Sequence, residues 1–504
     1  MNFISRQFLQ IIFILCFALM WSLNLFIEWG TDFGSYYAKS HFLSENFNLY
    51  KEAFVHKGPL YFLFISLIGK IIGWGQWQAF FVLFLTVFLF YLSIVYVISK
   101  RVQNKIIASI LLLFSTLLLI EQNTNLSLSL FQGTFLILSF YFMVESISAK
   151  DKYDFTYIIS IAFFSCAILC RIEVLIYAPV YLFSLIFASI NKKKPLTIFN
   201  KIFTCFIVVL IIFMVNKLYF DFTFLEFFEH NISFNQYYKN LLYVGYNNPF
   251  SLNFINNSYH FKLLVNNGLI FIFLATLFFK SISIFKHNKT IKRYDTQTQK
   301  YFLSILIIFT GILLWFISNS NKNYHLFILA VPLLFFVLYW GEVFSKNTKI
   351  LGFLFIPILL YFFLNIPGLH SVFNLVKNHN NCLVDIYCEQ SPIKSYRKTI
   401  NNMKDKDTSI IIGGRGWPHL FSGSKPGHSI SNWWMYYVDR PFITYNLLEH
   451  HDKLLNESPG YEFWIDNRLL KDKLERKRSL YFYEILKKSK FIKNEGNYSR
   501  YEIK

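Results

Sequence analysis

Charged residues are scarce in this chain of 504 residues. Only 15% of its residues are Asp, Glu, Lys or Arg, whereas 55% are hydrophobic and 20% are aromatic. This composition, with a mean hydropathy of +0.40, excludes an ordinary soluble domain, in which about 25% of residues are charged. The sequence therefore predicts a protein that crosses a membrane several times.

Cysteine is rare too, with six residues in the whole chain. Four of them lie inside apolar runs, where a free Cys behaves as a small hydrophobe: Cys16, Cys166, Cys170 and Cys205. Cys382 and Cys388 lie in a polar region, and both a disulfide and two free thiols stay open for them. No cluster of His, Cys and acidic residues has the spacing of metal ligands, so the sequence predicts no metal site.

Long apolar runs dominate what is present. The first run, residues 8–27, follows Arg6 and is long enough to span a hydrocarbon core of roughly 30 Å. Because no small-residue cleavage site follows it, we interpret it as an uncleaved helix with a cytoplasmic N-terminus. Further spans are expected near residues 76–98, 106–120, 126–147, 155–170, 173–190, 201–219, 263–284, 300–317, 325–343 and 350–366.

The short apolar stretch Leu60 to Ile72 decides the predicted topology. If it crossed the membrane, the basic loop clusters would face outward, which inverts the usual cytoplasmic bias of Lys and Arg. A juxtamembrane or re-entrant helix on the outer face puts all of these clusters inside. We therefore expect about eleven spans, with the N-terminus inside and the C-terminus outside. The clusters are Lys100/Arg101/Lys105, Lys150/Lys152, Lys192 to Lys194, Lys286/Lys289/Lys292/Arg293 and Lys346/Lys349.

The formal net charge of +20 follows from this topology. Cytoplasmic loops supply much of it, and a basic outer domain adds the rest, so the charge indicates no nucleic-acid partner. Long translocated domains are exempt from the charge rule, so the Lys-rich segment 467–493 is compatible with an outer location.

From about residue 367 the sequence no longer has the long apolar runs of membrane-spanning helices. Residues 409–414 form an apolar run that enters a Gly turn, as expected of a buried strand, and residues 442–445 and 461–465 have strand character. Residues 468–489 have the pattern of an amphipathic helix. We expect a mostly α fold with two parts: a polytopic membrane domain over residues 1–366 and an extracytoplasmic α/β domain over residues 367–504, long enough for its own core.

Polar residues gather in the predicted outer loops, most densely between Thr31 and Pro59 directly after the first span. Charged groups beside hydrocarbon are costly unless they contact water, a partner or a substrate, so such a cluster indicates a functional site. Candidate residues in this segment are Asp32, Tyr36, Tyr37, His56 and Lys57. The later outer loops add Glu121, Arg171, Lys322, Tyr324 and His325.

Two segments resemble the GT-C type membrane glycosyltransferases, a superfamily that includes protein O-mannosyltransferases and aminoarabinose transferases. Asp32-Phe33-Gly34-Ser35-Tyr36-Tyr37 and, about 25 residues later, the turn Lys57-Gly58-Pro59 are similar to the acid, tyrosine and K-P-P or K-G-P pattern of that family's first outer loop. Asn323-Tyr324-His325 is similar to a late family motif. The resemblance covers most of the chain as topology but only these short segments as sequence.

The resemblance implies transfer of a sugar, commonly with inversion, from a polyprenyl-phosphate-linked donor to a glycan, lipid or protein acceptor outside the membrane. A carboxylate that takes the proton of the acceptor is worth about 10²- to 10⁴-fold in such a reaction, and Asp32 is the candidate base. Fixed cations stabilise the leaving phosphate as its charge develops. Lys57, Arg171, Lys322 and His325 are the candidates for that role.

Each candidate also has a structural interpretation. Asp32 is a good helix N-cap, and the Lys57 ammonium can reach the membrane interface without a ligand. Arg171 can pair with Glu173, although residues two apart share no helix face. Tyr36 and Tyr37 are more often packing residues than substrate contacts, and aromatic residues such as Tyr324 favour the interface.

One departure from the family concerns cofactors. Many relatives carry a second acid in or after the second outer loop, where it helps to hold a divalent cation in the members that use one. Here residues 123–127 contain no acid, and Glu121 is the nearest. We therefore expect no required cofactor, with a divalent cation as the alternative.

Three other functions fit less well. A flippase or transporter of lipid-linked sugars typically has internal repeats and broken helices with polar sites at the membrane midplane, and no repeat is visible. A polysaccharide polymerase uses outer-loop arginines, of which Arg171 is the main instance. A ligand sensor would not require Asp32 and Lys57. The sequence thus favours a multi-pass glycosyltransferase of the inner (plasma) membrane.

Overall fold

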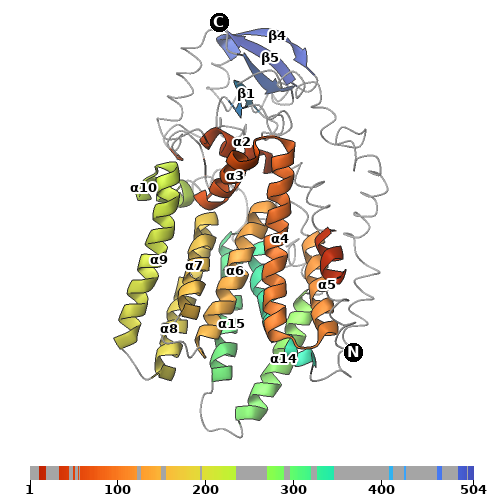
Figure 1. Ribbon diagram of the computed structural model, residues 1–504, viewed down its shortest axis with the longest axis vertical. Coiled ribbons are helices and arrows are strands. Elements are labelled where there is room, and N and C mark those ends of the chain that lie inside the picture. The colour runs from red at the N-terminus through yellow and green to blue at the C-terminus, as the bar shows by residue number, and fades with distance from the viewer. Residues whose placement is uncertain are drawn as a thin grey trace. The chain divides into compact units, whose positions relative to one another are not determined.

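The computed structural model describes the helices and strands that carry the fold. Nine of the apolar runs expected to be spans contain a helix (Figure 1), and residues 11–18 of the first run are helical. The expected span 350–366 lies outside the described residues. Those residues are 11–18, 33–44, 49–50, 55, 57–121, 126–148, 155–192, 196–233, 269–288, 296–318, 326–345, 408–412, 425–426, 462–467, 486–495 and 498–504.

The helices begin and end close to the predicted limits of the apolar runs. Their bounds are α4 (Gln76–Arg101), α5 (Lys105–Glu121), α6 (Leu126–Ser146), α7 (Phe155–Cys170), α8 (Ala178–Lys192), α9 (Leu196–Phe220), α14 (Leu269–Asn288), α15 (Thr296–Ser318) and α16 (Leu326–Trp340), which α17 (Glu342–Ser345) follows. Within the described part, four helices are long and apolar enough to cross a membrane, and five apolar helices are shorter. The mostly α membrane fold is therefore confirmed, whereas the count of eleven spans stays a prediction.

The chain forms two compact units, which are described separately. The first comprises Met1–Leu23, Thr86–Phe213 and Gly245–Phe373. The second comprises Asn24–Leu85, Met214–Val244 and Asn374–Lys504, so it combines the tail with two earlier segments. The two-domain boundary expected after residue 366 stays a prediction.

Small hydroxyl residues join the helices of the first unit. The Ser139 hydroxyl of α6 donates to the Ser160 carbonyl of α7 at 2.6 Å, and the Ser160 hydroxyl donates back to the Ser139 carbonyl at 2.8 Å. Ser139 also hydrogen-bonds the Tyr181 hydroxyl of α8. Inside apolar surroundings such bonds between helices replace the hydrophobic driving force that lipid does not supply. Cys16, Cys166 and Cys170 are free thiols, as expected.

A glycine permits the close approach of α15 and α16. A Cβ on Gly311 would lie 2.8 Å from Cγ of Pro332 and 3.0 Å from the hydroxyl of Tyr177. The proline ring is rigid, so it cannot rotate aside to relieve the contact. Gly311 is therefore the residue that lets these two helices pack at this distance.

The second unit contains the segment between Thr31 and Pro59, in which the sequence indicates a functional site. Helix α2 (Phe33–Leu43) is buried along its whole length, and it packs on α3 (Pro59–Ile72). The Ser66 hydroxyl of α3 donates to the Ser40 carbonyl of α2 at 3.0 Å. With 14 residues, α3 is about 21 Å long, shorter than a hydrocarbon core of roughly 30 Å. A helix therefore forms at Leu60 to Ile72 as expected, and its juxtamembrane placement stays a prediction.

A five-stranded sheet in the same unit confirms part of the expected α/β tail. Its order is β2-β1-β3-β5-β4, with β1 parallel to β2 and β3, and β5 antiparallel to β3 and β4. The strands are β1 (Thr408–Ile412), β2 (Lys425–Pro426), β3 (Glu462–Asp466), β4 (Ser489–Glu495) and β5 (Tyr498–Ile503). β1 and β3 occupy the strands predicted at 409–414 and 461–465, whereas the strand predicted at 442–445 lies outside the described residues.

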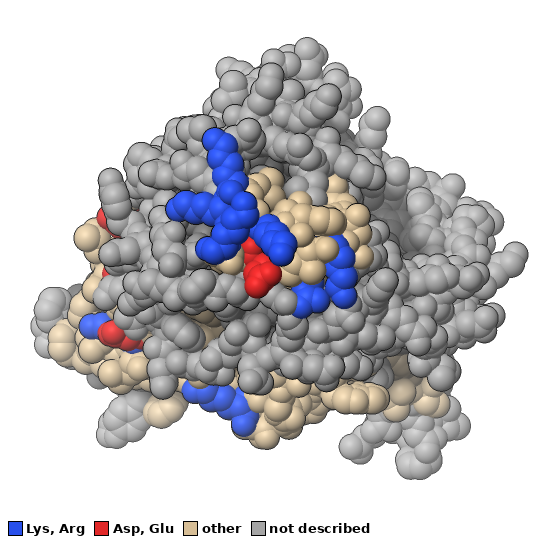
Figure 2. All heavy atoms as spheres, turned by 90° about the horizontal axis from the view of Figure 1, so that it is seen from above, with Lys and Arg blue, Asp and Glu red and all other residues tan. Residues whose placement is uncertain are grey.

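The helix predicted over residues 468–489 lies mostly outside the described residues, and its last residue is already the first of strand β4. β4 is an edge strand with exposed lysines at Lys488, Lys490 and Lys493 in and next to it. Seen from above, Lys and Arg side chains gather on this part of the surface (Figure 2). Lysines on an edge strand discourage pairing with another chain.

Candidate functional site

Tyr36 and Tyr37 of α2 make packing contacts with neighbouring elements. The Tyr36 ring meets Tyr61 and Phe62 of α3 edge to face, with centroids 5.9 and 5.8 Å away. Tyr37 is fully buried, and its hydroxyl accepts the main-chain N–H of Gly75 at 2.6 Å. These contacts favour the packing interpretation of both tyrosines. Their effect is to fix α2 against α3 and against the start of α4.

Lys57 lies two residues before the start of α3. Gly58 is extended at the N-cap with φ −66° and ψ 158°, it provides no side-chain cap, and Pro59 opens the helix. A proline at this position loses no intrahelical hydrogen bond and holds the φ that the helix needs. Lys57 is half-buried. The turn therefore places a lysine beside the positive end of a helix, an arrangement that favours an anion.

Tyr50 and, through it, the distant Asn231 hold this turn, and neither was among the residues predicted from the sequence. Tyr50 is fully buried, and its hydroxyl donates to the Lys57 carbonyl at 3.2 Å. Asn231, in the π-helical segment η3 (Glu229–Ser233), donates from Nδ2 to the Tyr50 hydroxyl at 2.9 Å. Tyr50 and Asn231 are 181 residues apart, so no local sequence pattern links them.

His230 of η3 is a buried neutral group beside Tyr50. Its ring lies 4.9 Å from the ring of Tyr50, and 2% of the residue is exposed. Burial lowers the pKa of His230 to about 4, and the nearby main chain of Val55 offsets this only in part. His230 therefore carries no charge near neutral pH and acts here as a packing residue.

Arg171 lies in the first unit, between α7 and the 3-10 helix η2 (Ile172–Tyr177). It is extended, with φ −154° and ψ 124°, and its main-chain N–H is bonded to the Ala167 carbonyl at 3.1 Å. Only 3% of the residue is exposed. After Arg171 the chain continues through η2 into α8. A guanidinium buried to this degree is costly unless it meets an anion or polar groups, which keeps Arg171 a candidate.

Several predicted site residues lie outside the described part of the chain: Asp32, His56, Lys322, Tyr324 and His325. Helix α2 begins at Phe33, the residue that follows Asp32. Glu121 is the last residue of α5, and its side chain is not among those described. Within the described residues no group of three His, Cys, Asp or Glu side chains is arranged to hold a metal ion.

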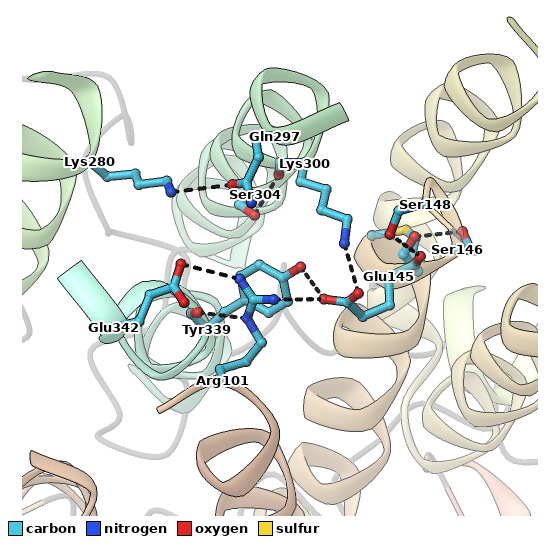
Figure 3. Close-up of polar contacts among 11 residues, drawn as sticks. Arg101, Glu145, Ser146, Ser148, Lys280, Gln297, Lys300, Ser304, Tyr339 and Glu342 are labelled. Carbon is cyan, nitrogen blue, oxygen red and sulfur yellow. Dashed lines mark hydrogen bonds and ion pairs between the residues drawn. The ribbon is translucent and has the colours of Figure 1, made fainter. Parts of the chain in front are cut away.

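A second polar cluster, in the first unit, joins the helix ends that the predicted topology places at the cytoplasmic face (Figure 3). Glu145 of α6 accepts Lys300 Nζ of α15 at 2.7 Å, Arg101 of α4 at 3.4 Å and the hydroxyl of Tyr339 of α16. Arg101 also pairs with Glu342 of α17 at 3.6 Å and lies over the Tyr339 ring at 4.2 Å. From the sequence, Arg101 was predicted only to belong to a basic cytoplasmic loop cluster. The position of this charge near the end of an apolar helix is the sequence signal that could have predicted an ion pair, because such charges need partners.

Comparison with known proteins supports the family resemblance. Residues 56–219, about a third of the chain, match the family model described as dolichyl-phosphate-mannose-protein mannosyltransferase. This region begins in the turn before α3 and extends nearly to the end of α9. A comparison with curated proteins gives no match.

Two similar solved structures cover nearly all of the chain. ArnT from Cupriavidus metallidurans, bound to undecaprenyl phosphate, has 12% identity and a TM-score of 0.51 over 98% of this chain and 97% of its own. The archaeal oligosaccharyltransferase AglB from Archaeoglobus fulgidus, in complex with an inhibitory peptide and a dolichol-phosphate, has 10% identity and a TM-score of 0.49, over 92% of this chain and 70% of its own. At this identity the likeness to ArnT shows a shared fold. Residues 56–219 are therefore similar to one family of membrane glycosyltransferases, and the chain as a whole shares the fold of ArnT.

Proposed function

We propose that the protein transfers a sugar from a polyprenyl-phosphate-linked donor to an acceptor on the outer face of the inner (plasma) membrane, with inversion at the anomeric carbon. The observation that supports this best is the turn before α3, where Lys57 lies beside an uncapped helix N-terminus in the region of the family match. The undecaprenyl phosphate named for ArnT and the dolichol-phosphate named for AglB are lipids of this chemical class.

The proposed reaction is a single displacement. An acceptor hydroxyl or amine attacks the anomeric carbon, and Asp32 takes its proton. The bond between that carbon and the phosphate oxygen breaks, and the lipid phosphate leaves with the electron pair. Lys57 and the first-turn N–H groups of α3 stabilise the charge that grows on the phosphate, and this lowers the barrier because the interaction strengthens toward the transition state.

The other candidates have supporting roles in this proposal. Arg171, Lys322 and His325 add positive charge for the phosphate, and His56, Glu121 and Tyr324 contact the sugar or the acceptor. Tyr36 and Tyr37 shape the site through the packing of α2 on α3. The sugar is a hexose or a pentose, and the acceptor is a cell-surface glycan, a lipid or a protein.

The test is sugar transfer by purified protein in lipid nanodiscs, with a panel of polyprenyl-phosphate sugars and candidate acceptors. Asp32→Asn should lower the rate by about 10²- to 10⁴-fold, the usual worth of a general base. Asp221→Asn is the matched control, because Asp221 is an exposed acid of the same unit in a left-handed conformation, φ 44°, which Asn also tolerates.

Transfer retained in Asp32→Asn would overturn the role of Asp32. Movement of lipid-linked sugar across the membrane without any transferred product would favour the flippase alternative, and joining of whole repeat units would favour the polymerase.

A further inference from the structure

The Lys57 turn is held from a segment that follows α9. Asn231 Nδ2 donates to the carbonyl of Phe227 at 2.9 Å and to the Tyr50 hydroxyl at 2.9 Å, and that hydroxyl donates to the Lys57 carbonyl at 3.2 Å. A hydroxyl can accept one hydrogen bond while it donates another. These bonds form a continuous chain from α10 (Phe224–Phe228) to Lys57, two residues before α3.

Tyr50 adopts a conformation that needs support. Its φ is +71°, in the left-handed region that non-glycine residues seldom occupy and that costs on the order of 1 kcal/mol or more. The adjacent Leu49 N–H donates to the Phe220 carbonyl at the end of α9, at 3.0 Å. The Tyr50 ring packs against Phe222 and Phe227, with centroids 5.4 and 6.3 Å away. Surrounding contacts therefore fix both the main chain and the ring of Tyr50.

Burial also sets the protonation of this hydroxyl. Tyr50 is fully buried, and Asn231 is 2% exposed. Burial raises the pKa of Tyr50 above its ordinary value, so the hydroxyl keeps its proton and stays a donor toward Lys57. Pro59 restrains the other side of the turn at the first position of α3.

We propose that Tyr50 and Asn231 are positioning residues that hold the Lys57 turn so that its ammonium meets the phosphate of the lipid donor. This inference rests on the proposed function, because it assumes that Lys57 contacts the phosphate. Tyr50 and Asn231 act through the main chain of Lys57, and neither touches the donor. Their loss should therefore weaken recognition of the phosphate and leave recognition of the lipid chain unchanged.

Binding to two lipid probes separates these effects. Undecaprenyl phosphate and the uncharged alcohol undecaprenol are titrated against the full chain in nanodiscs. Tyr50→Phe removes one hydroxyl and keeps the ring, so it should weaken binding of undecaprenyl phosphate by about five- to tenfold, the usual worth of one hydrogen bond. Asn231→Asp should have a similar effect, because its carboxylate would take the Tyr50 proton that now goes to Lys57. Binding of undecaprenol should not change for either variant.

Tyr219→Phe is the matched control. It makes the same chemical change in the same unit, and the Tyr219 hydroxyl has no hydrogen bond within the described part of the chain. Its binding of both probes should equal that of the wild type. Lys57→Ala should lose phosphate recognition, and Tyr50→Phe added to it should cause no further loss.

The outcomes distinguish this inference from the proposed function. If the wild type does not prefer undecaprenyl phosphate to undecaprenol, or Lys57→Ala keeps that preference, the proposed donor site fails and the inference fails with it. If Lys57→Ala loses the preference but Tyr50→Phe retains it, only the positioning role is overturned. Equal weakening of both probes in Tyr50→Phe would show a general structural defect and would also overturn that role.

Discussion

Glu145 should be the residue whose loss most weakens the predicted cytoplasmic end of the helix bundle. Its carboxylate meets Lys300, Arg101 and the Tyr339 hydroxyl, so one side chain of α6 joins α4, α15 and α16. The side chain of Lys300 is 8% exposed, that of Arg101 16% and that of Glu145 23%. Among the described residues, Glu145 is the one carboxylate within salt-bridge distance of Lys300.

The magnitude follows from this burial. Removal of one partner of a buried ion pair costs about 3–5 kcal/mol, because the remaining charge loses its partner inside the protein, whereas an exposed pair contributes about 0–1 kcal/mol. Glu145 is between these limits, so we expect Glu145→Ala to lower the free energy of unfolding by about 2–3 kcal/mol. Glu145→Gln retains an acceptor for Lys300 and Tyr339 and should cost about 1–2 kcal/mol.

Unfolding in mixed micelles by titration with SDS, followed by circular dichroism, measures both variants. Combination of Glu145→Gln with Lys300→Met removes both charges. The loss of unfolding free energy in the double variant should therefore be smaller, by about 1–2 kcal/mol, than the sum of the losses in the two single variants. Lys100→Met is the control, because it removes a positive charge from an exposed residue of α4 and should change stability by less than about 0.5 kcal/mol.

Additive effects of Glu145→Gln and Lys300→Met would refute this reasoning. A loss below about 0.5 kcal/mol in Glu145→Ala would do the same, because the cluster would then behave as a set of surface ion pairs.

Three further predictions follow from the packing, the titration and the topology. Gly311→Ala should lower the free energy of unfolding by about 1–3 kcal/mol in the same SDS titration, because its Cβ would meet the Pro332 ring at 2.8 Å; an unchanged stability would show that α15 and α16 separate freely. The pKa of His230 is lowered to about 4 from an ordinary value of about 6.5, so the unfolded chain binds the proton more readily and stability should fall by up to about 3 kcal/mol as the pH drops from about 6.5 to 4. His230→Gln should remove this component from thermal unfolding curves recorded across that range, and an identical pH profile in the variant would contradict it. Cysteines introduced at 286–293 should resist a membrane-impermeant thiol reagent added outside intact cells, and labelling there would overturn the predicted orientation.

The sequence predicts the helices well because the physical cause is local. A run of apolar residues long enough for the hydrocarbon core forms a helix wherever it stands in the chain, since only internal hydrogen bonds satisfy the main chain there. Accordingly, both ends of the expected span 126–147 lie within one residue of the ends of α6. The ends of the expected span 201–219 lie within five residues of the ends of α9. Strands β4 and β5 escaped notice because they depend on partners elsewhere, such as the stacked Phe463 and Tyr501 rings of β3 and β5.

In the candidate site, too, some features could be predicted from the local sequence and others depend on distant contacts. Gly58 and Pro59 mark the start of α3 in the sequence itself, and Lys57 before them is a visible candidate because cations beside a membrane need a reason. For Tyr36 and Tyr37, sequence alone left substrate contact and packing open, and the structure shows rings packed against α3 and a hydroxyl bonded to Gly75.

By itself, the sequence determined the membrane class, the position of most helices and the segment that holds the Lys57 turn, because each depends on neighbouring residues and on the cost of placing polar groups in hydrocarbon. Only the tertiary structure decided which distant groups complete one another. The contacts of Tyr50 with Asn231 and of Glu145 with Lys300 join residues 181 and 155 positions apart. Such pairs form because folding buries polar groups that must then find partners, and the identity of each partner depends on how the whole chain packs.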